Sequence, residues 1–277
     1  MQKKLSTMIM TMVLGTSLCI TGCGDQSTAS NETASLTFES VNTEEVSLIA
    51  LGNSDVPVGQ YSEEIFTNLG IWDEIQPKIS FGGNVKEVLS QVALGSVDCG
   101  VVYATDAYTE SGVEIVAFAP EGSIETPVVY PAALLQNCSQ PEAAQAFLSY
   151  LQTEEAKEVF ESVGFSMYDE NSTVAEVSYP ADADTATVTV FAAASMTESL
   201  TELGDSFMAA YPNIQLIFNF DSSGTLKTQI ESGAEADLII SAAAKQMNGL
   251  QEENYINVDT RIDLLKNEVV LIVPANP

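Results

Sequence analysis

Two blocks of alternating strand and helix patterns constrain the fold of this chain more than any other feature. Apolar runs predict strands at 46–52, 79–81, 99–104, 113–119, 128–135, 188–192, 214–220, 236–242 and 268–274. Helical periodicity and capping residues predict helices at 60–69, 85–94, 141–163, 196–210, 225–232 and 244–253. This alternation is typical of an α/β fold. A chain of 277 residues, 45% of them hydrophobic, suits one large domain or two lobes.

The first residues have the pattern of a bacterial export signal. Lys3 and Lys4 precede an apolar run at 5–20, which is too short and too close to the terminus for a dedicated transmembrane helix. The tetrapeptide ITGC, which ends at Cys23, is similar to a lipoprotein cleavage box. We therefore predict a signal peptide at 1–22, a lipid on Cys23 and a flexible tether at 23–39, on the extracytoplasmic face of the bacterial cell membrane. The alternative is an ordinary signal peptide with a chance cysteine.

The composition excludes several classes of site. The chain has no histidine, which rules out Ser-His-Asp and Cys-His catalysis and histidine-ligated metal centres. It also lacks a GxxxxGK[ST] loop and a GxGxxG turn. Its 39 acidic and 9 basic residues give a formal net charge of −30, which argues against nucleic acid as a partner. We accordingly predict no catalytic residue, no direct metal ligand and no cofactor, and therefore no enzyme.

Cysteine usage leaves one question open. If Cys19 leaves with the signal and Cys23 carries lipid, Cys99 and Cys138 remain in the fold, and neither has a CxxC neighbour. A disulfide between these two is one alternative. The apolar run around Cys99 favours the other, a small buried core residue.

Four turns that lead into predicted helices are suited to holding an oxyanion without a positive side chain. Unpaired N–H groups and the helix dipole favour negative charge at a helix N-terminus. The turns lie at 56–59, 82–85, 194–195 and 222–225. Tyr103, at the end of another predicted strand, can add a hydroxyl.

Each of these features also has a purely structural explanation. Ser195 with Glu198 has the S-x-x-E pattern of a capping box, and Asn84 with Glu87 makes a second credible cap. Val-Pro-Val-Gly is a common sequence at the start of a helix, and Ser-Ser-Gly is a common loop sequence. A buried tyrosine such as Tyr103 is more often part of the core.

Long stretches of both blocks resemble periplasmic molybdate-binding proteins. The stretches 188–207, 218–242 and 264–274 are similar to the N-terminal half of that family, and 49–73, 77–89, 100–107 and 130–135 to its C-terminal half. The resemblance implies a two-lobed, type II periplasmic-binding-protein fold with a hinge and an interlobe cleft. It implies one lobe at 40–126 and another at 127–168 plus 187–277.

The order of the two halves is reversed relative to that family. The half that usually comes first begins here at Val188, and the acidic, proline-containing stretch 169–186 joins the usual C-terminus to the usual N-terminus. We therefore predict a circularly permuted chain with a linker at 169–186, in which one of two hinge crossings is interrupted. The alternative is a fragment of a tandem fusion.

The resemblance also implies a function. It implies a monomeric solute-binding lipoprotein that captures molybdate or tungstate and delivers it to the membrane permease of an ABC transporter. Matched position by position, the ligand contacts fall on the hydroxyls of Ser195, Ser223 and Tyr103 and on the main-chain N–H groups of Val58 and Val85. The alternatives are binding or sensing of another small anion, such as sulfate, phosphate or a small carboxylate, and a non-functional fragment of a tandem fusion.

Overall fold

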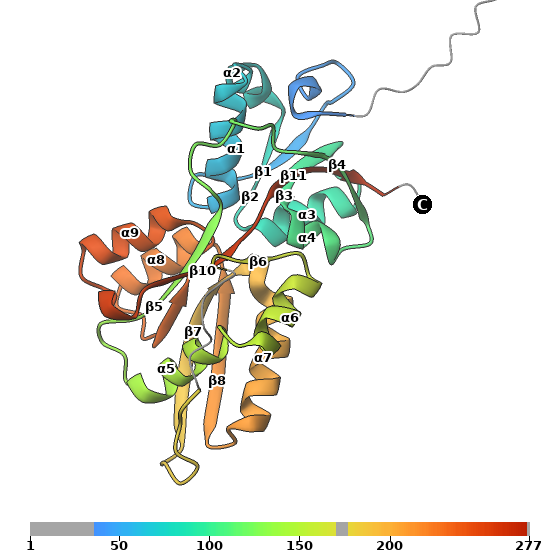
Figure 1. Ribbon diagram of the computed structural model, residues 1–277. Helices are drawn as coiled ribbons and strands as arrows, with labels where there is room; N and C mark the ends of the chain where they lie inside the picture. Colours follow the sequence, from blue (N-terminus) through green and yellow to red (C-terminus); the bar gives the residue numbers. More distant parts are fainter. Residues whose placement is uncertain (1–35, 170–176, 276–277) are drawn as a thin grey trace, which may run out of the picture. The chain divides into compact units, whose positions relative to one another are not determined.

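The computed structural model describes residues 36–169 and 177–275 (Figure 1). Within these residues the strands form two sheets, one of five strands in the order β2-β1-β3-β11-β4 and one of six in the order β6-β10-β5-β9-β7-β8. The parts built on these sheets are called the first lobe (36–118 and 269–275) and the second lobe (129–169 and 177–266) below. The predicted signal peptide, the predicted lipidation site at Cys23 and most of the predicted tether lie outside the described residues.

The first lobe is built on a mixed sheet. Strand β1 is parallel to both of its neighbours, β2 and β3, whereas β11 runs antiparallel between β3 and β4. The strands are β1 (Ile49–Gly52), β2 (Ile79–Gly82), β3 (Cys99–Tyr103), β4 (Val113–Phe118) and β11 (Val269–Pro274). The last strand was predicted to belong with the second lobe, and its pairing with β3 and β4 places it in the first.

Helices pack on both faces of the first sheet. Helix α1 (Pro57–Asn68) follows β1 and α3 (Val85–Ala93) follows β2. The strand order makes these two crossovers run in opposite directions, so right-handed crossovers put the helices on opposite faces. The shorter elements are η1 (Phe38–Ser40), α2 (Trp72–Ile75), η2 (Gln76–Lys78) and α4 (Ala104–Tyr108).

The start of the first lobe lies inside the segment predicted as a tether. Phe38 is fully buried, and its ring centroid lies 5.8 Å from that of Phe66 on α1. The fold therefore begins before residue 40, because Phe38 contributes to the core.

In the second lobe, the buried positions of the central strands alternate between two cores. Phe191 and Ile239 pack with residues of α8 and α9, whereas their strand neighbours Val190 and Leu238 belong to the main core. The strands are β5 (Val129–Leu134), β6 (Ser166–Met167), β7 (Ala186–Ala193), β8 (Ile214–Asp221), β9 (Leu238–Ile240) and β10 (Ile262–Lys266). Strand β7 is parallel to β8 and β9, and the pairs β9–β5, β5–β10 and β10–β6 are antiparallel.

The helices of the second lobe follow the same division. Figure 1 shows α8 and α9 on one side of the sheet and α6 and α7 on the other. The elements are α5 (Pro141–Tyr150), α6 (Glu154–Ser162), η3 (Ala194–Met196), α7 (Thr197–Ala210), α8 (Ser223–Glu231), α9 (Ala244–Glu252) and η4 (Val258–Thr260). The helical stretch predicted at 141–163 is divided, because Thr153 caps α6 by accepting the Ala156 N–H at 3.2 Å.

Two segments connect the lobes in the described part of the chain. Residues 119–128 lead from β4 to β5, and residues 267–268 lead from β10 to β11. The Asn267 N–H donates to the Val128 carbonyl at 3.1 Å, so the two crossings lie side by side. Both are continuous, and the prediction of an interrupted hinge crossing is therefore wrong.

Two further expectations concern individual residues and the membrane. Cys99 and Cys138 are both free thiols, and Cys99 is buried in β3 as the core interpretation predicts. No helix among the described residues is long and apolar enough to cross a membrane.

Candidate functional site

A small cavity lies where the ends of parallel strands from both lobes meet. Its lining comes from segments that follow β1, β2 and β3 in the first lobe and β7, β8 and β9 in the second. Ligands of α/β proteins commonly bind outside the carboxyl ends of parallel strands where the strand order reverses, as it does at β1 and β7. The cavity is small: its empty volume, open solvent included, is about 200 Å³. In this closed form it excludes a large organic ligand.

The structure brings all five predicted contact residues to this cavity. Its lining includes Val58, Val85, Tyr103, Ser195 and Ser223. Each is at most 5% exposed, so the lobes are closed over the site. Their role in binding a ligand stays a prediction.

The first lobe presents main-chain donors at two helix N-termini. Helix α1 begins directly against β1, because a Cβ on Gly59 would lie 2.2 Å from the Gly52 carbonyl oxygen. The N–H of Val58 belongs to the first turn of α1 and that of Val85 to the first turn of α3, where helical N–H groups have no intrahelical partner. Both N-termini favour a negative charge in the cavity.

The cap predicted at the start of α3 is confirmed. The Asn84 side chain accepts the Glu87 N–H at 3.0 Å, and the Glu87 carboxylate accepts the Gly83 N–H at 2.7 Å. This arrangement pairs the N–H groups of Gly83 and Glu87. It leaves the Val85 N–H available to the cavity.

The hydroxyl of Ser223 is oriented by the segment that follows β9. Ser222 is the cap of α8 and accepts the Thr225 N–H at 3.1 Å, so Ser223 is not needed for capping. The Ser223 Oγ accepts the Ala242 N–H at 2.9 Å. Because a hydroxyl also carries one proton, Ser223 keeps a donor for a ligand.

Ser195 does not form the alternative capping box with Glu198. Its Oγ lies 2.9 Å from the Tyr130 hydroxyl, and the Glu198 carboxylate accepts from Lys86 Nζ at 2.8 Å instead. The Asn267 side-chain amide donates to the Tyr130 oxygen at 3.1 Å. Either hydroxyl can donate in the pair of Tyr130 and Ser195, and when Tyr130 donates, the Ser195 proton is left for the cavity.

Tyr130 and Asn267 are functional candidates that the sequence reasoning missed. Both lie at the crossings between the lobes, Tyr130 just after the first and Asn267 within the second. Tyr130 had a signal in the sequence, a polar group inside the apolar run of a predicted hinge strand, whereas Asn267 lies between Lys266 and Glu268 and had no such local signal. A buried polar side chain needs a partner, so such positions are worth testing for a supporting role.

Tyr103 reaches across the cleft. Its hydroxyl donates to the Ala242 carbonyl of the second lobe at 3.3 Å, and its ring packs edge-on against Tyr130 with centroids 5.7 Å apart. Burial raises the pKa of both phenols well above the usual value. Both therefore remain protonated hydrogen-bond donors at physiological pH.

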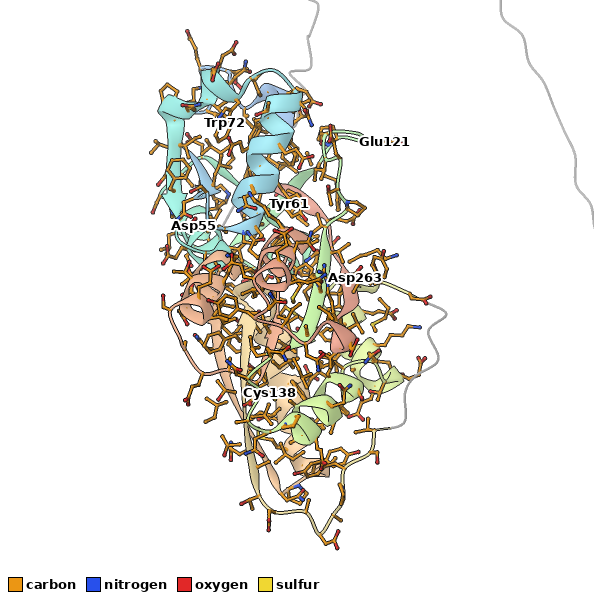
Figure 2. All side chains as sticks on the ribbon, turned by 90° about the vertical axis from the view of Figure 1, so that its left-hand side faces the viewer. Asp55, Tyr61, Trp72, Glu121, Cys138 and Asp263 are labelled. Carbon is orange, nitrogen blue, oxygen red and sulfur yellow. The ribbon has the colours of Figure 1, made fainter. Side chains whose placement is uncertain are left out.

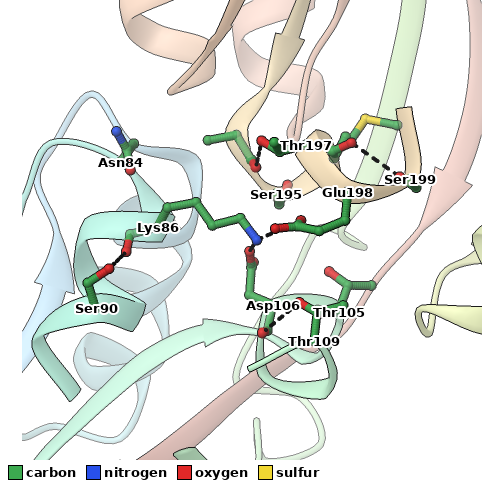
Figure 3. Close-up of polar contacts among 12 residues, drawn as sticks. Asn84, Lys86, Ser90, Thr105, Asp106, Thr109, Ser195, Thr197, Glu198 and Ser199 are labelled. Carbon is green, nitrogen blue, oxygen red and sulfur yellow. Dashed lines mark hydrogen bonds and ion pairs between the residues drawn. The ribbon is translucent and has the colours of Figure 1, made fainter. Parts of the chain in front are cut away.

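The electrostatics of the site come from main-chain dipoles and hydroxyls. Among the described residues, no lysine or arginine lines the cavity, whereas Asp221 does and accepts the Ser222 N–H at 2.7 Å. A cation stands nearby in the first turn of α3: Lys86 Nζ lies 3.1 Å from Asp106 and 2.8 Å from Glu198 (Figure 3). The described residues also hold no acidic or cysteine cluster suited to a metal ion.

The fold and this cavity agree with a comparison against protein families. The sequence profile of bacterial extracellular solute-binding proteins matches residues 25–166 and 188–277. The chain belongs to this family. Members are described as bacterial extracellular solute-binding proteins, so membership places the protein outside the cytoplasm.

Two curated relatives match part of the chain. The protein YvgL of Bacillus subtilis (strain 168), described as an ABC transporter substrate-binding lipoprotein, is 42% identical over 126 residues, which cover 45% of this chain and 48% of that protein. The molybdate-binding protein ModA of Haemophilus influenzae is 35% identical over 129 residues, which cover 46% of this chain and 50% of that protein. The chain thus spans about half the length of the curated relatives it matches.

A solved structure confirms the predicted architecture. The phosphate-binding protein of a phosphate ABC transporter from Streptococcus pneumoniae TIGR4 aligns with a TM-score of 0.51 over 83% of this chain and 89% of that chain. The sequence identity is 13%, so the likeness concerns the fold alone. The two-lobed α/β fold of solute-binding proteins is therefore confirmed.

Proposed function

We propose that this protein captures molybdate or tungstate outside the cytoplasm and delivers it to the permease of an ABC transporter. The observation that carries the proposal is the buried cavity on which the N-termini of α1, α3 and α8, the turn at η3 and three hydroxyls converge. The printed name of the relative ModA, a molybdate-binding protein, supports the same ligand.

The donors fit a tetrahedral oxyanion that carries no exchangeable proton. Main-chain N–H groups and the hydroxyls of Ser195 and Ser223 donate, and the Tyr103 hydroxyl would exchange the Ala242 carbonyl for the ligand. Each hydrogen bond to a charged partner contributes about 1.5 to 3 kcal/mol net. Half a dozen such bonds give tight binding without a salt bridge. The acidic surface slows encounter more than it weakens the bound state, because charges beyond a Debye length of about 8 Å are largely screened.

Titration calorimetry with four anions tests the ligand. Molybdate and tungstate should bind one to one, and sulfate at least about tenfold more weakly, because donors spaced for a larger tetrahedron cannot all reach a smaller one and a buried donor left unpaired costs about 1 to 3 kcal/mol. Equal affinity for molybdate and sulfate would contradict the proposal. If none of the four anions (molybdate, tungstate, sulfate and hydrogen phosphate) binds, the proposed function is wrong.

Hydrogen phosphate is the second candidate, and Asp221 is the observation that favours it. A carboxylate in an oxyanion site accepts a hydrogen bond from a protonated oxyanion and repels one that has no proton. Asp221→Asn should therefore weaken hydrogen phosphate binding if that is the ligand. If molybdate is the ligand, the same substitution should leave molybdate affinity equal or higher.

We further propose a lipid anchor on Cys23, a monomeric state and no enzymatic activity. The cleavage box in the sequence and the description of YvgL as a lipoprotein support the anchor. The cavity lining offers hydrogen-bond donors without a nucleophile and base in contact, which supports binding over catalysis. Mass spectrometry of the membrane-extracted protein should find a diacylglyceryl group on Cys23.

The reversed order of the two halves is proposed as a circular permutation with its linker at 169–186. Two observations support it: the family profile matches two separate stretches, and the gap between them, 167–187, nearly coincides with this linker. The alternative is a fragment of a tandem fusion. The mass of the native protein extracted from its cells separates the two, because a fusion would carry additional copies of the halves.

A further inference from the structure

Lys86 contacts both lobes at once. Its Nζ lies 3.1 Å from Asp106 Oδ1 of α4, in the same lobe, and 2.8 Å from Glu198 Oε2 of α7, in the other (Figure 3). The three side chains differ in exposure: that of Asp106 is fully buried, that of Lys86 is 26% exposed and that of Glu198 is 48% exposed. The contact that crosses the cleft is therefore the outer and more solvated of the two.

The position of this contact relates it to the anion cavity. Lys86 directly follows Val85, and Glu198 lies one helical turn after Ser195. Val85 and Ser195 are cavity residues of opposite lobes. A bond between Lys86 and Glu198 therefore holds together the two helix starts whose donors face the ligand.

We infer that Lys86 is an interlobe clamp that fastens the closed form of the site: Asp106 holds its ammonium group in the first lobe, and Glu198 of the second lobe binds it when the cleft closes. This inference rests on the proposed function. Lys86 is a positioning residue, since its ammonium is bonded to carboxylates and does not line the cavity.

The charges explain why such a clamp is reversible. In an open form, Lys86 would keep Asp106 as a partner, so opening leaves no buried charge unpaired. Glu198 would return to water at little cost because it is already half exposed. A partly solvated ion pair is weak enough to break each time the ligand is released.

The first experiment compares two substitutions on the same helix. Glu198→Gln removes the cross-cleft charge, and Glu202→Gln makes the same chemical change one turn further along α7, where Glu202 is exposed and in no ion pair among the described residues. The ligand used as the probe is molybdate. Its association and dissociation rates are measured by stopped-flow fluorescence or by a surface-binding assay. Glu198→Gln should raise the dissociation rate about 3- to 10-fold and leave the association rate within about twofold. Equal dissociation rates for the two variants would overturn the clamp.

A conservative variant separates clamping from general stability. Lys86→Arg keeps the charge and should stay within about threefold of the native dissociation rate, whereas Lys86→Met should not. Lys86→Met alone would leave Asp106 buried without its cation and could unfold the first lobe. It is therefore measured together with Asp106→Asn, and the double variant should release molybdate as fast as Glu198→Gln. Native-like release from the double variant would overturn the inference.

A ligand-free measurement distinguishes failure of the clamp from failure of the proposed function. If the native protein binds none of the tested oxyanions, the proposed function fails, and the clamp is judged by amide hydrogen exchange of the ligand-free protein. Glu198→Gln should speed exchange in the first turns of α3 and α7 at least about threefold over Glu202→Gln, because opening exposes these N–H groups. Matching exchange in the two variants would overturn the clamp even then.

Discussion

Each lobe buries an aspartate, and the pKa values of the two carboxyl groups are shifted in opposite directions. In the second lobe, the Asp237 carboxylate accepts the N–H groups of Ser139 at 2.7 Å and Thr189 at 2.8 Å. Burial acts to raise the pKa of Asp237, but these hydrogen bonds outweigh it and lower the pKa. In the first lobe, burial raises the pKa of Asp106 to about 6, against the opposing effect of Lys86.

The difference distinguishes a carboxylate that stabilises one lobe from a carboxylate whose environment changes when the cleft opens or closes. Asp237 joins strand β7 to the loop that leads into α5, all within one lobe, so its bonds are independent of cleft closure. Asp106 depends on Lys86, which also bonds across the cleft. A fully satisfied carboxylate fixes a fold, whereas a poorly satisfied one next to the cleft leaves the protein sensitive to closure and to pH.

The largest expected effect is on stability, from Asp237→Ala. The substitution leaves the N–H groups of Ser139, Gln140 and Thr189 without their acceptor, at about 1 to 3 kcal/mol for each buried donor. We expect a loss of about 4 kcal/mol in the free energy of unfolding by urea, with Asp205→Ala on the exposed side of α7 as the control. If Asp237→Ala lowers the free energy of unfolding by less than about 1 kcal/mol, Asp237 does not stabilise its lobe as this comparison requires.

The second prediction concerns the pH dependence of stability and rests on Asp106. Its pKa is about 6 in the folded protein and 3.8 in the unfolded chain, so between these values the folded state binds more protons. Stability from this group therefore falls as the pH rises from about 4 to 6, by up to about 3 kcal/mol. The groups that face Asp106 are Lys86, Glu198, Tyr103 and Tyr130.

Urea denaturation at pH 4, 5, 6 and 7 measures this effect as a difference between proteins. The native protein should lose stability relative to Asp106→Asn as the pH rises through this window, because the amide cannot ionise. A difference between the two that is independent of pH would show that Asp106 is not forced to carry its charge in a desolvated position.

The lobes also differ in the donors that they offer the ligand, which gives the third prediction. The second lobe uses the hydroxyls of Ser195 and Ser223, whereas Val58 of the first lobe offers its main chain. Ser195→Ala or Ser223→Ala should weaken oxyanion binding by about 1.5 to 3 kcal/mol. Ser223→Ala should also lower ligand-free stability by about 1 to 3 kcal/mol, because the buried Ala242 N–H loses its acceptor. Val58→Ala should change affinity little. Calorimetry measures the molybdate affinity of each variant, with Ser162→Ala on α6 as the control. Similar affinities for all of these variants would contradict the hydroxyl contacts.

Much of the fold could be predicted from the sequence because its local signals agree with the tertiary structure. Helix α3 was predicted at 85–94 and spans Val85–Ala93, since Asn84 and Glu87 cap it and its apolar residues recur at helical spacing. Strand β8 was predicted at 214–220 and extends to Asp221. The turns between such elements predicted the candidate site, because a helix start and a nearby hydroxyl are local features.

The rest depended on contacts between distant segments. Strand β10 was missed because Ile262–Lys266 is short and becomes a strand by pairing with β5 and β6, which are remote in sequence. Ser195 and Glu198 satisfied a local capping pattern, yet their partners Tyr130 and Lys86 come from elsewhere in the chain. Local propensity cannot rank such partners, because their benefit arises only after the lobes have folded and closed.

The smallest expected effect is at the contact between the lobes beside the cavity. Gly224, in the first turn of α8, faces the loop before α1: an added Cβ would lie 2.1 Å from the Asp55 carbonyl oxygen. Asp55 is exposed at the edge of the first lobe (Figure 2), but the contact is with its main chain, so the loop before α1 must shift when the cleft closes. We therefore expect Gly224→Ala to weaken oxyanion binding by about 1 kcal/mol, at the low end of the cost of overpacking.

Stability should move in the other direction, and this makes the result specific to closure. Alanine is favoured over glycine in a helix by up to about 0.5 to 1 kcal/mol, and an open ligand-free form has no clash with Asp55. Gly249→Ala on α9 is the matched control, since its Cβ would meet the end of the flexible Lys227 side chain in the same lobe. Calorimetry and thermal unfolding of both variants should show lower affinity for Gly224→Ala alone. If both variants keep native affinity, the contact between Gly224 and Asp55 does not limit closure, and the bonds of Lys86 and Tyr103 remain to define the closed form.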